Sequence, residues 1–154
     1  MSFQISGLPT ELVRALQTGG RDVYDNEPEK RISTGSGTPC RHYLEPIAEG
    51  EEYLVVAYRP FETLQPYAET GPIFLHATPC RKATLQSELP QILSSPDYIV
   101  RGYNACEQIV YGTGGVIPTN QIANRAEELL AEENVSFVHV RSARNNCFQC
   151  RIDR

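Results

Sequence analysis

The chain has 154 residues, of which 40% are hydrophobic and 21% are charged, as in an ordinary globular domain. No run of about 18 apolar residues predicts a membrane-spanning helix, and residues 1–7 lack the basic and apolar regions of a secretion signal. The net charge of −5 disfavours nucleic acid as a partner, because a polyanion repels an acidic protein. We therefore expect a single domain over residues 1–154 in the cytoplasm, with neither membrane nor nucleic acid as a partner.

The first half of the chain predicts short strands, one helix and one long loop. Thr10 has the side chain of a helix N-cap, and the glycines at 19 and 20 end the helix that would follow it. The polar stretch 21–39 is rich in Gly, Ser, Thr and Pro, which favours an exposed loop. Strands are expected at residues 3–6, 53–58 and 73–76, the second of them central because β-branched and aromatic residues dominate it.

The second half of the chain predicts two helices, a hairpin and two final strands. One helix begins near Thr84, carries Leu85, Leu89, Ile92 and Leu93 on one face, and is split by Pro90. The other is capped by Thr119 and carries an apolar stripe at Ile122, Ala126, Leu129 and Leu130. Strands are expected at residues 98–103, 108–111, 135–140 and 147–152, the first two forming the hairpin. The predicted fold class is α+β, with a mostly antiparallel sheet, two to three helices and a ββαββ lobe over about residues 97–154.

The sequence contains five cysteines, an odd number that argues for free thiols or metal ligands rather than a disulfide framework. Cys40 lies in a knuckle-like stretch, a hairpin follows, and His76 and Cys80 come just before the expected helix. This is the layout of a treble-clef zinc site, in which zinc takes four nitrogen or sulfur ligands. We therefore interpret residues of about 37–95 as a treble-clef-like lobe with three candidate zinc ligands.

The fourth zinc ligand is the open question in this lobe. Tyr43 occupies the second position of the knuckle, and a phenol is a very poor zinc ligand. His42 lies one residue short of that position, and a distorted knuckle would bring it to the metal. The alternative is a degenerate, metal-free scaffold in which Cys40 and Cys80 are small buried side chains and His76 is an ordinary strand histidine.

Cys147 and Cys150 form the only C-x-x-C pair in the sequence. Residues three apart in a strand face opposite ways, so Cys150 is expected on the core side with Phe148 and Ile152, while Cys147 faces away. Cys147 follows Arg and Asn residues, an electropositive setting that makes it a candidate nucleophile with His139 as its base. The alternative is a passive thiol in a capped turn.

The C-terminal segment 136–154 holds four arginines and one aspartate, a local net charge of +3. Guanidinium groups bind carboxylates and phosphates through paired hydrogen bonds, so this hairpin is a candidate site for a small anion. The residues expected to bind it are Arg141, Arg144, Asn145, Asn146 and Arg151. The alternative is that these side chains are simply solvated.

Four stretches of the chain resemble one bacterial family. They are residues 58–61 (YRPF), 65–76 (QPYAETGPIFLH), 109–116 (IVYGTGGV) and 138–153 (VHVRSARNNCFQCRID). In them the chain resembles the family known as domain of unknown function 1203, over nearly its full length. The resemblance implies no assigned activity. It also implies a cysteine in many members where this chain has Tyr43, so the chain departs from the family at the residue that would complete a four-ligand set.

Three hypotheses for function follow from the sequence. The first is a small binding or accessory module whose C-terminal hairpin binds a small anion or a protein partner. The second is a small enzyme with Cys147 as nucleophile, and the third is a structural protein stabilised by zinc. Three histidines, with no convincing triad or complete cofactor motif, favour the first hypothesis. Zinc is the one cofactor that the sequence indicates, and the oligomeric state stays open.

Overall fold

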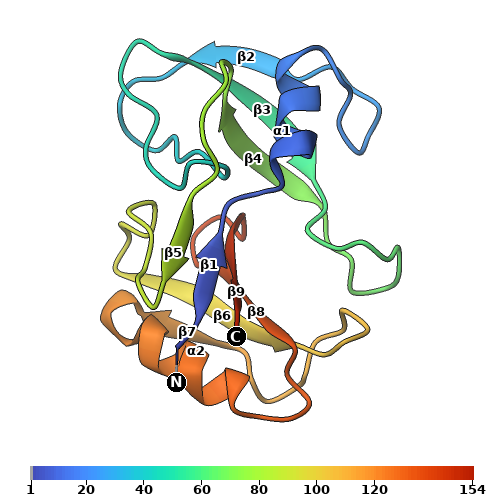
Figure 1. Cartoon of the computed structure of the whole chain (residues 1–154), viewed down its shortest axis with the longest axis vertical. Coiled ribbons are helices and arrows are strands. Elements are labelled where there is room, and N and C mark those ends of the chain that lie inside the picture. Colours follow the sequence, from blue (N-terminus) through green and yellow to red (C-terminus); the bar gives the residue numbers. More distant parts are fainter. Residues whose placement is uncertain (1) are drawn as a thin grey trace.

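The structure, a computed structural model, describes residues 2–154 and places its strands in two antiparallel sheets (Figure 1). The larger sheet contains, in spatial order, β5 (Thr84–Gln86), β1 (Gln4–Ser6), β9 (Phe148–Asp153), β8 (Phe137–Ser142), β6 (Asp97–Tyr103) and β7 (Gly115–Pro118). The smaller sheet contains β2 (Glu29–Ile32), β3 (Glu52–Tyr58) and β4 (Gly71–His76). The α+β class with a mostly antiparallel sheet is thereby confirmed.

Each sheet is accompanied by one α-helix (Figure 1). Helix α1 (Thr10–Gln17) lies beside the smaller sheet and buries Val13 and Leu16. Helix α2 (Ile122–Leu130) follows a short 3₁₀ turn and lies against the larger sheet, with all four residues of its predicted apolar stripe buried. Within residues 2–154, neither helix is long and apolar enough to cross a membrane.

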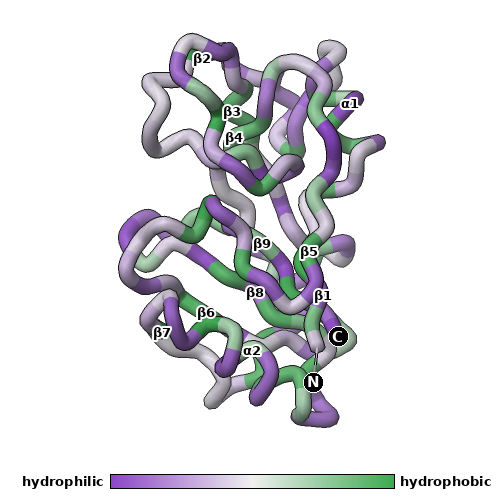
Figure 2. Tube along the Cα trace, turned by 60° about the vertical axis from the view of Figure 1, so that its left-hand side comes forward, coloured by the Kyte–Doolittle hydropathy of each residue, from purple (hydrophilic) through white to green (hydrophobic). Residues whose placement is uncertain are grey.

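The buried side chains form one main hydrophobic cluster for each sheet. The larger cluster joins α2 to β6, β8 and β9, and the smaller one joins α1 to β3 and β4. Figure 2 shows hydrophobic segments along the strands of both sheets. Phe148 is the one residue of β9 that belongs to the smaller cluster, so its ring links the two halves of the core.

A β-bulge in β9 overturns one prediction about the C-terminal strand. Val140 pairs with Cys150 but Arg141 pairs with Phe148, so Gln149 is an extra residue between them. The extra residue turns Phe148 to the opposite face from Cys150, which packs with the larger cluster. The prediction that Phe148 shares a face with Cys150 and Ile152 was therefore wrong, because strict alternation fails at a bulge.

The helix predicted to begin near Thr84 is also wrong, because strand β5 occupies residues 84–86. Leu85 pairs with Ile5 of β1. The free edge of β1 has backbone hydrogen-bonding groups that pair with residues 84–86 only when these form a strand. Pro90 further opposes a helix by removing a backbone donor. The apolar spacing instead reflects a strand and turn whose side chains pack on the larger cluster. The Cys/His region is therefore not confirmed as a treble clef.

Two further strands, β2 and β7, lie outside the predicted strand ranges. β2 falls within the expected loop 21–39, and all four of its residues are exposed, so no hydrophobic alternation marked it. The strand predicted at 108–111 is reduced to a single antiparallel bridge between Ile109 and Tyr103, and β7 forms the longer pairing with β6. Thr113 explains the change, because its hydroxyl accepts the Gly102 N–H at 3.0 Å and its backbone stays outside the ladder.

Candidate functional site

Three predicted metal ligands, Cys40, His76 and Cys80, converge in the structure. Cys40 opens a tight turn, His76 ends β4, and Cys80 lies in the loop before β5. One ligand atom of each lies within 4.8 Å of the others, and the two Sγ atoms are 4.0 Å apart. These residues form a group that could hold a metal ion.

His42 lies against the same cluster. Its imidazole is fully buried, with Nδ1 3.1 Å from Cys80 Sγ and Nε2 2.9 Å from Thr10 Oγ1. Thr10 was predicted to cap α1, but the helix begins without a side-chain cap, and the hydroxyl bonds the imidazole instead. A hydrogen bond to one ring nitrogen orients a histidine so that the other can bind a metal.

His76 has the same arrangement with a carboxylate in place of the hydroxyl. Its Nε2 lies 3.5 Å from Glu51 Oε2, which leaves Nδ1 for the sulfur atoms. Nδ1 is buried and has no hydrogen-bond partner among residues 2–154, an arrangement that costs free energy unless another ligand satisfies it. Tyr43 meets the His76 ring edge-on, with ring centroids 5.8 Å apart, so it covers the histidine.

The surroundings of Cys40 stabilise a thiolate, whereas the hydrogen bond with Cys40 raises the pKa of Cys80. The Cys80 thiol donates to Cys40 and lowers the pKa of Cys40, although burial opposes this shift. The backbone N–H groups of Tyr43 and His76 also donate to Cys40 Sγ, at 3.4 and 3.5 Å. Burial lowers the pKa of His42, which keeps its imidazole in the neutral form that binds metals.

The spacing of the two sulfur atoms distinguishes a metal site from a disulfide. A disulfide would require an S–S distance of about 2.05 Å. Tetrahedral zinc with Zn–S bonds of about 2.3 Å separates two sulfur ligands by about 3.8 Å. The observed separation of 4.0 Å therefore fits two ligands of one tetrahedral ion.

Three polar side chains of helix α1 form hydrogen bonds with residues in and next to this cluster. Thr10 bonds His42, Arg14 donates to the Cys80 carbonyl at 2.6 Å, and Gln17 donates to the carbonyls of His76 and Thr78, both at 2.9 Å. A Cβ at Gly7 would collide with the carbonyl oxygen of His42, so only glycine fits there. The cluster thus joins α1 to the end of β4.

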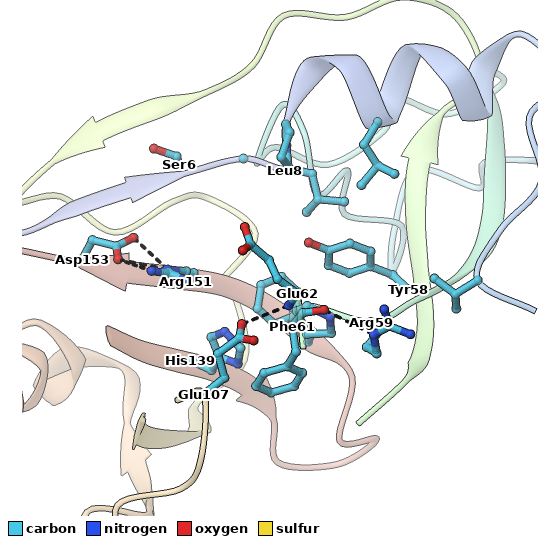
Figure 3. A pocket seen from close by; sticks show the side chains of 16 residues that line it. Ser6, Leu8, Tyr58, Arg59, Phe61, Glu62, Glu107, His139, Arg151 and Asp153 are labelled. Atoms are coloured by element: carbon cyan, nitrogen blue, oxygen red, sulfur yellow. Dashed lines mark hydrogen bonds and ion pairs between the residues drawn. The ribbon is translucent and has the colours of Figure 1, made fainter. Parts of the chain in front are cut away.

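His139 lines a separate cavity of about 410 Å³ between the two sheets, shown in Figure 3. The His139 ring is fully buried. Its centroid lies within 5.2 Å of the ring centroids of four aromatic residues, Phe61, Tyr103, Phe137 and Phe148. Neither ring nitrogen has a hydrogen-bond partner among residues 2–154. Burial, with help from neighbouring arginines, holds the pKa of His139 well below its usual value, so the imidazole stays neutral.

The depressed pKa of His139 predicts an acid-dependent loss of stability. Below pH about 6.5 this histidine binds a proton in the unfolded chain but stays neutral in the folded chain. The free energy of unfolding therefore falls as the pH falls. His139→Phe removes the group that binds this proton, together with its two unpaired ring nitrogen atoms. Between pH 7 and 5.5, the unfolding free energy of the wild type should fall by about 1 kcal/mol more than that of the variant in urea titrations. Equal losses in both proteins would show that His139 titrates normally.

The predicted catalytic pair, Cys147 and His139, is not brought together by the fold. Cys147 lines a different cavity, of about 330 Å³, whereas His139 lines the one in Figure 3. Cys150 packs inside the larger cluster, whereas Cys147 is partly exposed and lines the second cavity. Cys147 therefore has no histidine among the residues that line its cavity, within the described chain.

The predicted anion ligands are also dispersed. Each of the three arginines already pairs with a carboxylate: Arg141 with Glu69 at 3.3 Å, Arg144 with Asp97 at 2.5 Å and Arg151 with Asp153 at 2.8 Å. Asn146 adopts a left-handed backbone and accepts a hydrogen bond from Arg141 through its carbonyl. Asn145 alone among the five lines the Cys147 cavity.

Sequence reasoning missed the arginine that does line that cavity. Arg41 lies between Cys40 and His42, and nothing in its local sequence distinguishes it from a solvated surface charge. The turn that brings the two metal-ligand candidates together also directs Arg41 into the interior. Only the three-dimensional structure reveals this position.

These observations define an α+β protein with a Cys/His group that could hold a metal ion. The chain belongs to the family described as protein of unknown function DUF1203, whose model matches residues 37–154. The matched region contains Cys40, His76 and Cys80, and also His42. Comparisons with curated proteins and with solved structures gave no match.

Proposed function

We propose that this protein is a zinc-stabilised binding module in which Cys40, His42, His76 and Cys80 hold one structural zinc ion. The observation that carries the proposal is the convergence of two sulfur atoms and the His76 imidazole, with the buried imidazole of His42 3.1 Å from Cys80 Sγ. The position of His42, with Nδ1 3.1 Å from Cys80 Sγ, supports it as the fourth ligand, the role for which a distorted knuckle was needed.

The ligand set favours zinc in a structural role. Two sulfur and two nitrogen ligands in a tetrahedron are typical of zinc, and four protein ligands leave no open position for a reacting water. Thr10 and Glu51 would orient the two imidazoles from behind, as hydrogen-bonding partners do in metal sites. Zinc bound here would hold α1 and the end of β4 together.

A binding role is supported by the space between the two sheets. Cavities of about 410 and 330 Å³ lie there, at the lower end of the size range of small-molecule sites. The predicted nucleophile and base line different cavities, which supports binding over cysteine catalysis. None of the five cysteines, which all lie within residues 2–154, forms a disulfide, which supports a reducing compartment such as the cytoplasm.

The fourth ligand gives the sharpest test of the zinc site. Protein purified without a histidine tag should contain one zinc per chain. In a chelator competition, His42→Ala should bind zinc at least about tenfold more weakly, because it loses one of four ligands. His139→Phe is the matched control, since it removes a buried histidine outside the cluster. Unchanged zinc affinity in His42→Ala, or no stoichiometric zinc in the wild type, would refute the four-ligand site.

A further inference from the structure

The cavity beside Cys147 contains a buried guanidinium. Arg41 is only 2% exposed, yet it lines this cavity of about 330 Å³. Its Nε donates to the Phe148 carbonyl and its Nη1 to the Pro39 carbonyl, both at 2.8 Å. These two bonds fix the plane of the guanidinium group.

Within the part of the chain that the structure describes, no carboxylate neutralises the charge of Arg41, whose guanidinium carbon lies 5.8 Å from the centre of the Phe74 ring. No ion pair to Arg41 exists among residues 2–154, in contrast to Arg141, Arg144 and Arg151. Its Nη2 makes no hydrogen bond to any of these described residues either. A buried charge without a partner is costly, and buried charges in proteins are normally paired.

The lining of the cavity suits an oxyanion. No carboxylate lines it in the described chain, so Arg41 is its only charged residue. The other polar lining residues carry hydroxyl, amide and thiol side chains, among them Ser94, Ser95, Ser142, Asn145, Cys147 and Gln149. Hydroxyl and amide groups can donate hydrogen bonds to anion oxygens around a guanidinium. By contrast, the cavity of His139 is lined by three carboxylates and two arginines, which leaves no excess of positive charge there.

We infer that this cavity is a binding site for a small oxyanion, a phosphate or carboxylate group, held by Arg41 and the polar side chains of the β8–β9 turn. The inference names a ligand class for the proposed binding module and so rests on that function. It does not require zinc at the Cys/His cluster. The anion would supply the counter-charge that Arg41 lacks.

Alkylation of the five cysteines reports directly on occupancy of this cavity. Cys147 lines the cavity and is partly exposed, whereas Cys106 is exposed elsewhere and serves as an internal reference. The full chain as purified is treated with iodoacetamide in inorganic phosphate, acetate or chloride at equal ionic strength, and each cysteine is followed by mass spectrometry. For a dissociation constant near 1 mM, about 10 mM anion should slow Cys147 about tenfold and leave Cys106 unchanged.

A charge reversal at the cavity wall separates specific binding from general screening. Asn145→Asp places a carboxylate in the lining at an exposed position, so it should abolish the protection of Cys147 without unfolding the chain. Asn120→Asp is the matched control, because it makes the same charge change at an exposed site outside the cavity, and it should keep the protection.

The outcomes also separate this inference from the zinc proposal. Protection by phosphate alone or by acetate alone supports the site and identifies the head group. Protection by neither anion, or equal protection in Asn145→Asp, would overturn the site and leave Arg41 as an internal cross-link. Zinc content measured on the same samples shows whether the zinc proposal holds independently.

Discussion

Removal of zinc by a strong chelator should lower the melting temperature of the protein by about 10 °C. An ion present at about 1,000 times its dissociation constant adds about 4 kcal/mol to the folded state. For a chain of 154 residues each kcal/mol corresponds to roughly 2–4 °C. The loss should be partial rather than complete, because the larger hydrophobic cluster does not include the Cys/His residues. Scanning calorimetry with and without chelator measures the shift.

Two cysteine variants connect this shift to the cluster. Cys80→Ser should melt near the chelated wild type and should no longer respond to chelator, because its thiolate is lost. Cys106→Ser changes an exposed thiol outside the cluster and should behave as the wild type. If the chelator removes the zinc from the wild type and its melting temperature does not change, a structural role for the metal is refuted.

Phe148→Ala should destabilise the protein by about 3–5 kcal/mol, the usual cost of deleting a buried aromatic ring. Phe148 is 7% exposed and packs against Tyr58 and His139, with ring centroids 5.8 and 4.9 Å away. The ring is the contribution of β9 to the smaller cluster, so its loss opens a gap between the two sheets. Urea titration measures the change in the free energy of unfolding, with one spectroscopic signal monitored in each half of the molecule.

Val116→Ala is the matched control for this prediction. Val116 lies on β7 and is 59% exposed, so its truncation should change stability by less than about 0.5 kcal/mol. If Phe148→Ala also costs less than about 1 kcal/mol, the two halves of the core do not depend on this ring.

Periodic elements were predictable from the sequence, and elements fixed by distant partners were not. The apolar stripe of α2 and the strands β3, β6 and β8 follow from local hydrophobic patterns, and the structure confirms them. β5 was mistaken for a helix because its apolar spacing fits both, and only the free edge of β1 decides between them. The bulge at Gln149 likewise depends on the pairing of β9 with β8.

The sequence predicted the kind of chemistry at the candidate sites better than it predicted which residues form them. Cys40, His76 and Cys80 were found by residue type and spacing, and they do converge. The C-terminal arginines were misjudged as a group, because Glu69 and Asp97, which neutralise two of them, lie far away in the sequence. Arg41 was overlooked because its burial arises from the fold of the cluster around it and from no pattern in its neighbours.

X-ray absorption at the zinc edge tests the central claim most directly, because it counts the ligands of the bound ion in the untagged protein. The account requires one zinc per chain with two sulfur ligands at about 2.3 Å and two nitrogen ligands at about 2.0–2.1 Å. The His42→Ala protein should retain two sulfur ligands and only one histidine nitrogen. A wild-type spectrum with oxygen in place of the second histidine, or a protein that binds no zinc, would contradict the account.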